Sequence, residues 1–222
     1  MPASVIGQRI PHIEGTEKVT GATLYPGNVR LPGMVWGRCL RSPYAYARIK
    51  SVNTQRARAL PGVVAVIAGY DVPKTLVGRR LQDLPILARD VVRFIGERVA
   101  AVAAEDAETA ERALELIEVE YEELEPLLDP LQAMTPEAPL LHPDVQSYVN
   151  LPAAVTPDMK NVHSYQGWSR GDLAAGFADA DEIVEGVYTT GITHQAYIEA
   201  HAATVRIGED GRIHVWAAQK AP

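Results

Sequence analysis

The chain has 222 residues, of which 47% are hydrophobic and 22% are charged, a composition typical of globular proteins that bury a core. Its formal net charge of −7 argues against nucleic acids and anionic membranes as partners. The single cysteine, Cys39, excludes an internal disulfide framework and an iron–sulfur cluster, which needs about four thiolates. Neither a signal-peptide pattern nor an apolar run of about 20 residues is present, so we expect a cytoplasmic protein without a membrane span.

Residues 1–21 form an irregular arm, and the stretch 32–52 then reads as a strand, a polar turn and a second strand. Alternation along the first strand puts Trp36 on one face and Cys39 on the other. Pro43 interrupts the run because proline cannot donate a hydrogen bond to a sheet. We expect the turn to be a buried junction, and Cys39 to be a buried, inert thiol.

The next stretch predicts a small domain of mixed helices and strands. Its expected elements are a helix capped by Asn53 and ending near Ala59, a strand over 63–67, a strand over 98–103, a helix capped by Asp106, and a strand over 118–124. The helix after Asp106 is the best marked of these. Apolar residues recur along it at helical spacing, at Ala107, Ala110, Leu114 and Ile117.

An acidic run on the last of these strands invites a metal-site or acid–base interpretation. The run contains Glu118, Glu120, Glu122, Glu123 and Glu125. Strand alternation favours the plainer interpretation, because it puts the first three carboxylates on one face while Val119 and Tyr121 face the other way. We therefore expect a solvated outer face.

Seven prolines fall between Pro126 and Asp158, which is the composition of an extended crossing segment and not of packed helix or sheet. We place the domain boundary here. Beyond it, Asp172 is an N-cap candidate for a helix through Ala178. Strands are expected over 182–190, 197–207 and 212–218, the last two joined by a hairpin turn at Gly208 to Gly211. The last strand runs to the end of the chain, so this region looks unfinished.

The sequence contains no Ser–His–Asp spacing, CxxC pair, Walker loop or HExxH motif. Only His194, Glu199 and His201 form a group with metal-like composition. On a strand, Glu199 and His201 share a face while His194 points the other way, which is poor geometry for one metal ion. We expect structural roles for these three residues.

Several phrases resemble one known family in the same order. GRCLRSPYAYARI, residues 37–49, resembles the G-x-x-L-R-S-P-x-A-H-A-R-I signature of the molybdenum hydroxylases, the xanthine dehydrogenase and aldehyde oxidase family, with Tyr46 in place of the histidine. KVTGATLY near the N-terminus, ARALPGVVAVIAGYDVP and IEVEYEELEPLLDP are similar to that family's hammerhead domain. THQAYIEAH and DGRIHVWAAQKAP resemble its first molybdenum-cofactor segment, with Ala200 for the usual proline and Ala218 for the usual threonine.

The resemblance implies an α+β fold in three parts. These are an a/b hammerhead domain with its N-terminal arm over 1–129, a proline-rich linker over 130–160, and the first strands of a molybdopterin-binding domain over 161–222. In the family, the glutamine matching Gln219 donates a hydrogen bond to an oxygen ligand of molybdenum, and an amide suits that task because it carries no charge. We also expect Arg41, Tyr44 and Arg48 to hold the junction between the two domains, since arginine can bridge it bidentately.

The implied activity is oxidation of an aldehyde or an N-heterocycle with water as the oxygen source. The implied cofactor is molybdopterin, in its cytosine dinucleotide form, shared with the rest of the catalytic subunit. Iron–sulfur clusters and FAD are expected on partner subunits, because Cys39 alone cannot hold a cluster. The family's glycine-rich cofactor loop and late glutamate have no match here, so we expect the isolated chain to be inactive. Two alternatives stay open: a non-catalytic scaffold or assembly subunit that binds no molybdenum, and a truncated gene product.

Overall fold

The computed structural model describes residues 6–218 and divides the chain into two compact units. One unit joins residues 1–32 to residues 185–222, and the other spans residues 33–184. The N-terminal arm is thus grouped with the C-terminal region. No helix in residues 6–218 has the length and apolar character needed to cross a bilayer.

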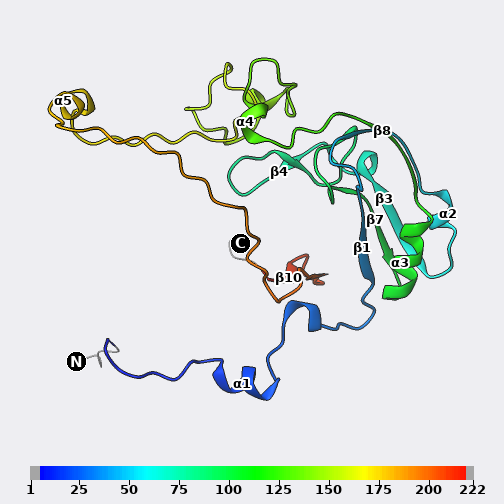
Figure 1. The fold of residues 1–222 in the computed structure, drawn as a ribbon. Coiled ribbons are helices and arrows are strands. Elements are labelled where there is room, and N and C mark those ends of the chain that lie inside the picture. Colours follow the sequence, from blue (N-terminus) through cyan, green and yellow to red (C-terminus); the bar gives the residue numbers. More distant parts are fainter. Residues whose placement is uncertain (1–5, 219–222) are drawn as a thin grey trace. The chain divides into compact units, whose positions relative to one another are not determined.

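Unit 33–184 contains two three-stranded antiparallel sheets (Figure 1). The first has the order β1 (Trp36–Arg41), β7 (Arg98–Ala104), β3 (Val63–Ala68), and the second has the order β6 (Val91–Val92), β2 (Ala47–Asn53), β8 (Glu118–Glu123). The shorter elements of this unit are α2 (Gln55–Arg58), η2 (Gly69–Asp71), the paired strands β4 (Leu76–Val77) and β5 (Leu84–Pro85), α3 (Ala107–Glu115), α4 (Pro130–Ala133), η3 (Val145–Ser147) and α5 (Leu173–Ala178).

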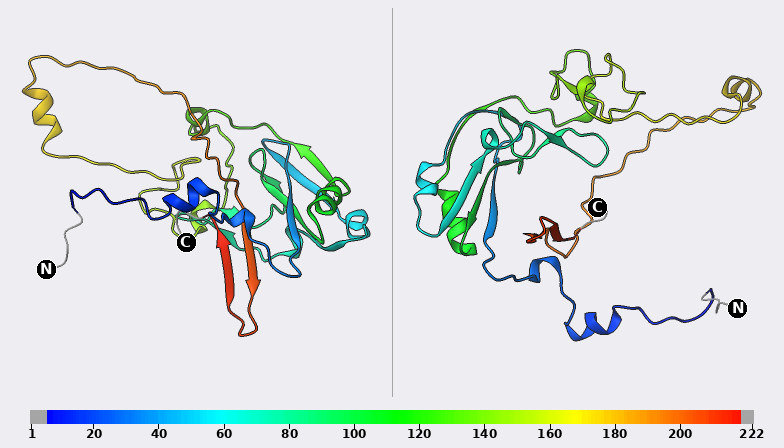
Figure 2. Two further views of the ribbon diagram at one scale, coloured as in Figure 1. Left: turned by 90° about the horizontal axis from the view of Figure 1, so that it is seen from below. Right: turned by 180° about the vertical axis from the view of Figure 1, so that it is seen from behind.

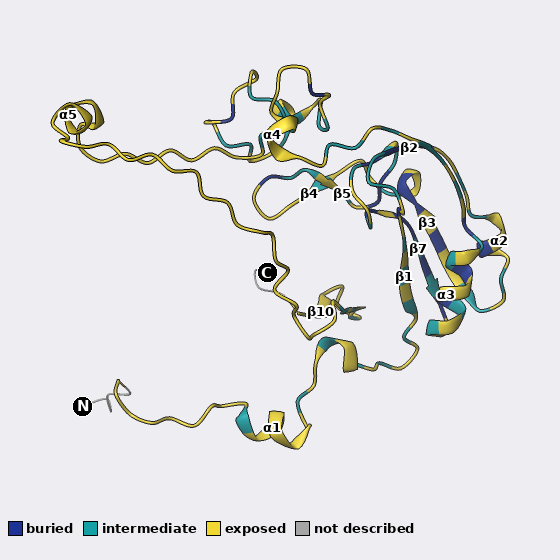
Figure 3. Ribbon diagram, viewed as in Figure 1, coloured by how far each residue is buried: buried dark blue, intermediate teal, exposed yellow. Residues whose placement is uncertain are grey.

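Helix α3 covers one face of the first sheet, against β1 and β7. Asp106 caps it as expected: its carboxylate accepts hydrogen bonds from the backbone N–H of Thr109 at 2.7 Å and from the hydroxyl of Thr109 at 2.9 Å. Ala110 and Ala113 are fully buried, and such small side chains let the helix lie close to the alanine-rich β7. The main core therefore lies between this helix and this sheet, where Figure 3 shows the buried parts of β3 and β7.

The alternation of β1 is as predicted, but the burial of Cys39 is not. Trp36 and Leu40 face inward and pack against the core under α3, whereas Cys39 is exposed on the other face of the sheet. The expectation of a buried thiol is therefore wrong. Alternation separates the two faces of a strand, but it does not say which face a helix covers.

The proline-rich segment after β8 folds back on itself and is not extended. Asn161 ties it together, because its side-chain amide donates to the carbonyls of Ala133 at 2.8 Å and Pro139 at 2.9 Å, and its amide oxygen accepts from the N–H of Leu141 at 2.9 Å. Lys160 adds a hydrogen bond to the carbonyl of Ala138 at 3.1 Å. Backbone groups that have no sheet or helix partner are satisfied in this way by two adjacent side chains.

The unit formed by both ends of the chain is small. Its elements are α1 (Gly15–Thr20), η1 (Pro26–Asn28), β9 (Ala203–Ile207) and β10 (Ile213–Ala217). Strands β9 and β10 form the expected hairpin, seen as two adjacent arrows in Figure 2. The turn is closed by the N–H of Gly208, which donates to Arg212 O at 2.8 Å, and Gly211 adopts a φ of 77° that favours glycine.

Two strand predictions near the C-terminus are corrected. The strand expected over 182–190 is absent, and the strand expected over 197–207 begins only at Ala203. Residues in this stretch are almost fully exposed: Val187 is 94% exposed, Tyr188 92% and Ile198 102%. This segment has the apolar pattern of a strand, but no strand among the described residues pairs with it. The helix predicted after Asp172 is confirmed as α5.

Candidate functional site

The polar turn after β1 is the point where the chain passes from one sheet to the other. Among residues 6–218, β1 pairs with β7 alone and β2 pairs with β6 and β8, so the two successive strands do not form a hairpin. The chain returns between β6 and β7, in the turn 93–97. Two backbone hydrogen bonds join the two crossings, from Ser42 N to Glu97 O and from Gly96 N to Ser42 O, both 2.8 Å.

Ser42 and Glu97 are the buried polar residues of the described chain, with exposures of 2% and 5%. The hydroxyl oxygen of Ser42 accepts a hydrogen bond from Tyr44 N at 3.0 Å. The Glu97 carboxylate accepts one from Arg93 N at 2.6 Å. Burial raises the pKa of the Glu97 carboxyl, and the hydrogen bond from the N–H of Arg93 and the charge of Arg93 only partly oppose that rise. Glu97 was not among the predicted site residues, although the Phe-Ile-Gly-Glu turn that carries it is visible in the sequence.

The three residues expected at the domain junction have different surroundings within unit 33–184. Arg41 is exposed, and its Nη1 donates to Gly96 O at 2.8 Å, so it braces the crossing. Tyr44 packs against Tyr121 with ring centroids 5.0 Å apart. Arg48 forms an ion pair with Glu122 at 3.0 Å. All three make these contacts within this unit, and their role toward a second domain stays a prediction.

The acidic strand β8 has the solvated outer face that its alternation predicts. Glu122 pairs with both Arg48 and Lys50 of the neighbouring strand, and Glu118 pairs with Arg56 at 2.9 Å. The hydrogen bonds from Lys50 and Arg48 lower the pKa of the Glu122 carboxyl. These pairs are exposed, and exposed pairs contribute little to stability. The carboxylates of β8 thus pair with cations on β2 and α2, which is not the arrangement of a metal site.

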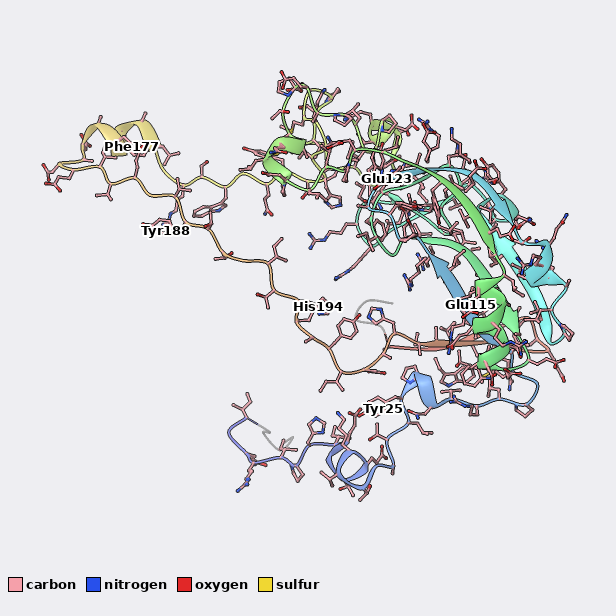
Figure 4. The ribbon with its side chains drawn as sticks, turned by 45° about the vertical axis from the view of Figure 1, so that its right-hand side comes forward. Tyr25, Glu115, Glu123, Phe177, Tyr188 and His194 are labelled. Atoms are coloured by element: carbon pink, nitrogen blue, oxygen red, sulfur yellow. The ribbon has the colours of Figure 1, made fainter. Side chains whose placement is uncertain are left out.

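The metal-like group near the C-terminus does not converge on one point. Tyr197 lies between the two histidines: its ring is 5.3 Å from the His194 ring and stacks at 4.7 Å on the His201 ring. His194 Nδ1 accepts a hydrogen bond from Ala196 N at 3.0 Å. Within residues 6–218, no group of three His, Cys, Asp or Glu residues could hold a metal ion. Figure 4 shows His194 and Tyr188 on an extended run of chain.

Gln219, the predicted cofactor contact, lies outside the described residues. The hairpin leading to it is described, and its register runs from Ile213 opposite Ile207 to Ala217 opposite Ala203 without a bulge. Trp216 and Ala217 are partly buried, whereas Ile213 and Val215 are exposed. The position of Gln219 is thus preceded by a regular paired strand.

Two family models match the chain in succession. One is described as "Aldehyde oxidase and xanthine dehydrogenase, a/b hammerhead domain" and matches residues 20–125. The other is described as "Molybdopterin cofactor-binding domain" and matches residues 155–222. The order of the two matches follows the order expected from the sequence.

Curated relatives extend over almost the whole chain. A probable xanthine dehydrogenase subunit from Bacillus subtilis is 37% identical over 92% of this chain and 26% of its own length. The carbon monoxide dehydrogenase large chain of Afipia carboxidovorans is 33% identical over 98% of this chain and 27% of its own length. The chain therefore spans about a quarter of the length of these relatives.

Solved structures have the same fold. The reconstituted CO dehydrogenase from Oligotropha carboxidovorans matches with a TM-score of 0.79 and 33% identity, covering 95% of this chain and 27% of that one. Quinoline 2-oxidoreductase from Pseudomonas putida 86 matches with a TM-score of 0.77 and 31% identity, covering 97% and 27%.

Proposed function

The chain belongs to the aldehyde oxidase and xanthine dehydrogenase family, and from this premise we propose that it is part of the catalytic subunit of a molybdenum-dependent hydroxylase. The observation that carries the proposal is the succession of a hammerhead match and a cofactor-domain match over 20–125 and 155–222. The relatives that match both parts carry the names of enzymes, which favours a catalytic role over a scaffold role.

The substrate class we propose is an aldehyde or an N-heterocycle, hydroxylated with oxygen from water. Support comes from relatives whose names specify nitrogen heterocycles. They include the nicotinate dehydrogenase large molybdopterin subunit of Eubacterium barkeri, 30% identical, and the nicotine 6-hydroxylase large subunit of Paenarthrobacter nicotinovorans, 31% identical.

The proposed cofactor is molybdopterin in its cytosine dinucleotide form, which supplies the redox chemistry when it is bound. Of the residues in this chain, we assign only Gln219 to it, as a neutral amide donor at the end of the β10 hairpin. The described part of the hairpin supports this assignment, because its strands are paired without a bulge as far as Ala217. His194, Glu199 and His201 do not fit a metal site, so we route no step through them.

The proposed partners are the rest of the catalytic subunit, an iron–sulfur subunit and an FAD subunit. The clusters are proposed to lie outside this sequence, because the single thiolate of Cys39 cannot hold an iron–sulfur cluster. Large apolar side chains that are exposed to solvent are a second reason to propose contact with another protein surface. They are Val184 at 90% exposure, Val187 at 94%, Tyr188 at 92% and Ile192 at 102%.

The test is co-expression of the chain with the polypeptide that carries the glycine-rich cofactor loop, followed by elemental analysis and activity assays. We expect near-stoichiometric molybdenum in the assembled complex. We also expect incorporation of labelled oxygen from water into an aldehyde or N-heterocycle. A complex that assembles fully but contains no molybdenum would favour the scaffold alternative and reject this proposal.

A further inference from the structure

A cavity of about 540 Å³ opens among the loops of unit 33–184, away from Gln219 in the sequence, and Arg93 at the start of the turn 93–97 is one of its lining residues. This volume lies within the range of small-molecule sites in proteins. The residues that line it come from three segments: 69–76, 82–93 and 144–149. Charged side chains of both signs line it: Lys74, Asp83, Arg89, Asp90, Arg93 and Asp144.

The segment 69–76 and Arg89 form a basic wall. Nε of Arg89 donates to Gly69 O at 3.3 Å and Nη2 donates to Val72 O at 3.2 Å. Its guanidinium also lies over the ring of Tyr70, 4.7 Å from the ring centre. A cation fixed in this way loses little conformational entropy when it binds an anion. Lys74 adds a second positive charge from the same segment.

A second wall is acidic. The N–H of Gln82 donates to Val149 O at 3.1 Å, which ties the loop bearing Asp83 to the segment bearing Asp144. In the described chain the carboxylates of Asp83 and Asp144 make no ion pair and no hydrogen bond, and the same holds for the ammonium of Lys74. The carboxylate of the third aspartate, Asp90, already accepts a hydrogen bond from the hydroxyl of Tyr70.

The remaining polar groups at the cavity are held by the protein itself. Nε of Arg93 donates to Leu141 O at 2.9 Å. The hydroxyl of Tyr148 lies 3.0 Å from Nδ1 of His142. Burial and the charge of Arg93 lower the pKa of His142, so this imidazole is neutral at pH 7 and adds no charge to the site. Lys74, Asp83 and Asp144 are thus the charged groups of the cavity that have neither an ion pair nor a hydrogen bond in the described chain, and Arg93 adds a positive charge that acts on Tyr148 together with the two aspartates.

We propose that this cavity binds a small amphoteric molecule, whose anionic group contacts Lys74 and Arg89 and whose ammonium group contacts Asp83 and Asp144. A ligand with only one charge would leave one wall without a counter-charge, and its affinity would be lower for that reason. The inference does not depend on the proposed molybdenum chemistry, because every residue that carries it lies between Gly69 and Val149.

The test uses 6-aminohexanoate as the amphoteric probe, with hexanoate and hexylammonium as single-charge analogues of the same length. Binding is measured on the whole chain by NMR, from shifts of the backbone amides of residues 74–76 and 147–149. We expect dose-dependent shifts with 6-aminohexanoate, and affinities about 10- to 100-fold lower for the two analogues. Glycine and 4-aminobutyrate then report the best spacing of the two charges.

Two variants test the two walls without disturbing them, because neither side chain makes a hydrogen bond in the described chain. Lys74→Met and Asp144→Asn should each weaken the binding of 6-aminohexanoate by about tenfold or more. Arg80→Met and Glu137→Gln are the matched controls, since both residues are exposed and neither lines the cavity, and they should leave binding unchanged. Absent amide shifts, equal binding of the three probes, or equal effects of variants and controls would overturn the proposal.

Discussion

Asn161 should stabilise the proline-rich segment far more than its size suggests, and the substitution Asn161→Ala tests this. The side chain forms three hydrogen bonds, of 2.8, 2.9 and 2.9 Å, to backbone groups of Ala133, Pro139 and Leu141. Each such bond contributes about 1 kcal/mol net. Asn161 also has a φ of 53°, in the left-handed region that asparagine tolerates better than alanine, which adds roughly 0.5–1 kcal/mol.

The expected loss is therefore about 3–4 kcal/mol in the stability of the segment. The assay is hydrogen exchange of the Leu141 amide, whose hydrogen bond goes directly to Asn161. If the segment opens locally, a loss of this size lowers protection of that amide roughly 100-fold or more, because each 1.4 kcal/mol is a factor of ten. Protection of the amides in β7 should change little, since that strand belongs to the main core.

Asn150→Ala is the matched control. Asn150 also has a positive φ, of 65°, but its side chain makes no hydrogen bond in the described chain. Its replacement should therefore cost only the backbone term, roughly 0.5–1 kcal/mol. If the two alanine variants change exchange of the Leu141 amide equally, the hydrogen bonds of Asn161 do not hold the segment and the reasoning is refuted.

Four further outcomes are expected. Glu97→Gln keeps an acceptor for the Arg93 N–H and removes the buried charge. Because the pKa of Glu97 in the folded protein is raised above its ordinary 4.5, the wild type should lose stability relative to this variant as the pH rises from 4.5 through that raised pKa. A difference in denaturation midpoints that does not change with pH would contradict this expectation. Arg41→Ala removes the bond to Gly96 O and should lower the melting temperature of the assembled enzyme, which calorimetry checks. Gln219→Ala in the assembled enzyme should cut turnover about 10²- to 10³-fold with molybdenum content near normal, whereas joint loss of both would indicate a structural role. Cys39 in the purified chain should react readily with a bulky thiol reagent, and slow labelling would mean that something covers it.

Local signals predicted the elements of the hammerhead part well. The Asp106 cap, the helical spacing after it and the alternation in β8 depend on neighbours within a few residues, so the sequence carries them directly. Cys39 was misplaced because both faces of β1 carry residues that a core accepts. Only the packing of α3 on Trp36 and Leu40 decides between the two faces, and that contact is not local.

Contacts between residues far apart in the sequence could not be predicted from local patterns. The proline content after β8 suggested an extended chain, but Asn161 bonds to residues 20, 22 and 28 positions before it, and no pattern announces such contacts. Near Val187 the alternation of apolar residues is real, yet a strand needs a partner for its backbone groups. The assignment of Gln219 to the cofactor depends on the family resemblance, since the neighbouring residues in the sequence do not distinguish this glutamine from others.

The strand order of the first sheet has a consequence for the synthesis of the chain. β7 is the central strand of the first sheet and forms every strand pair in it, yet it follows β1 and β3 in the sequence. Until β7 leaves the ribosome, β3 with its sequence Val-Val-Ala-Val-Ile-Ala has no partner. Such an apolar, uncharged strand associates readily with other nascent chains. A slow codon stretch placed between β3 and β7 should therefore increase aggregation in cells, and the same pause placed after β8 should not.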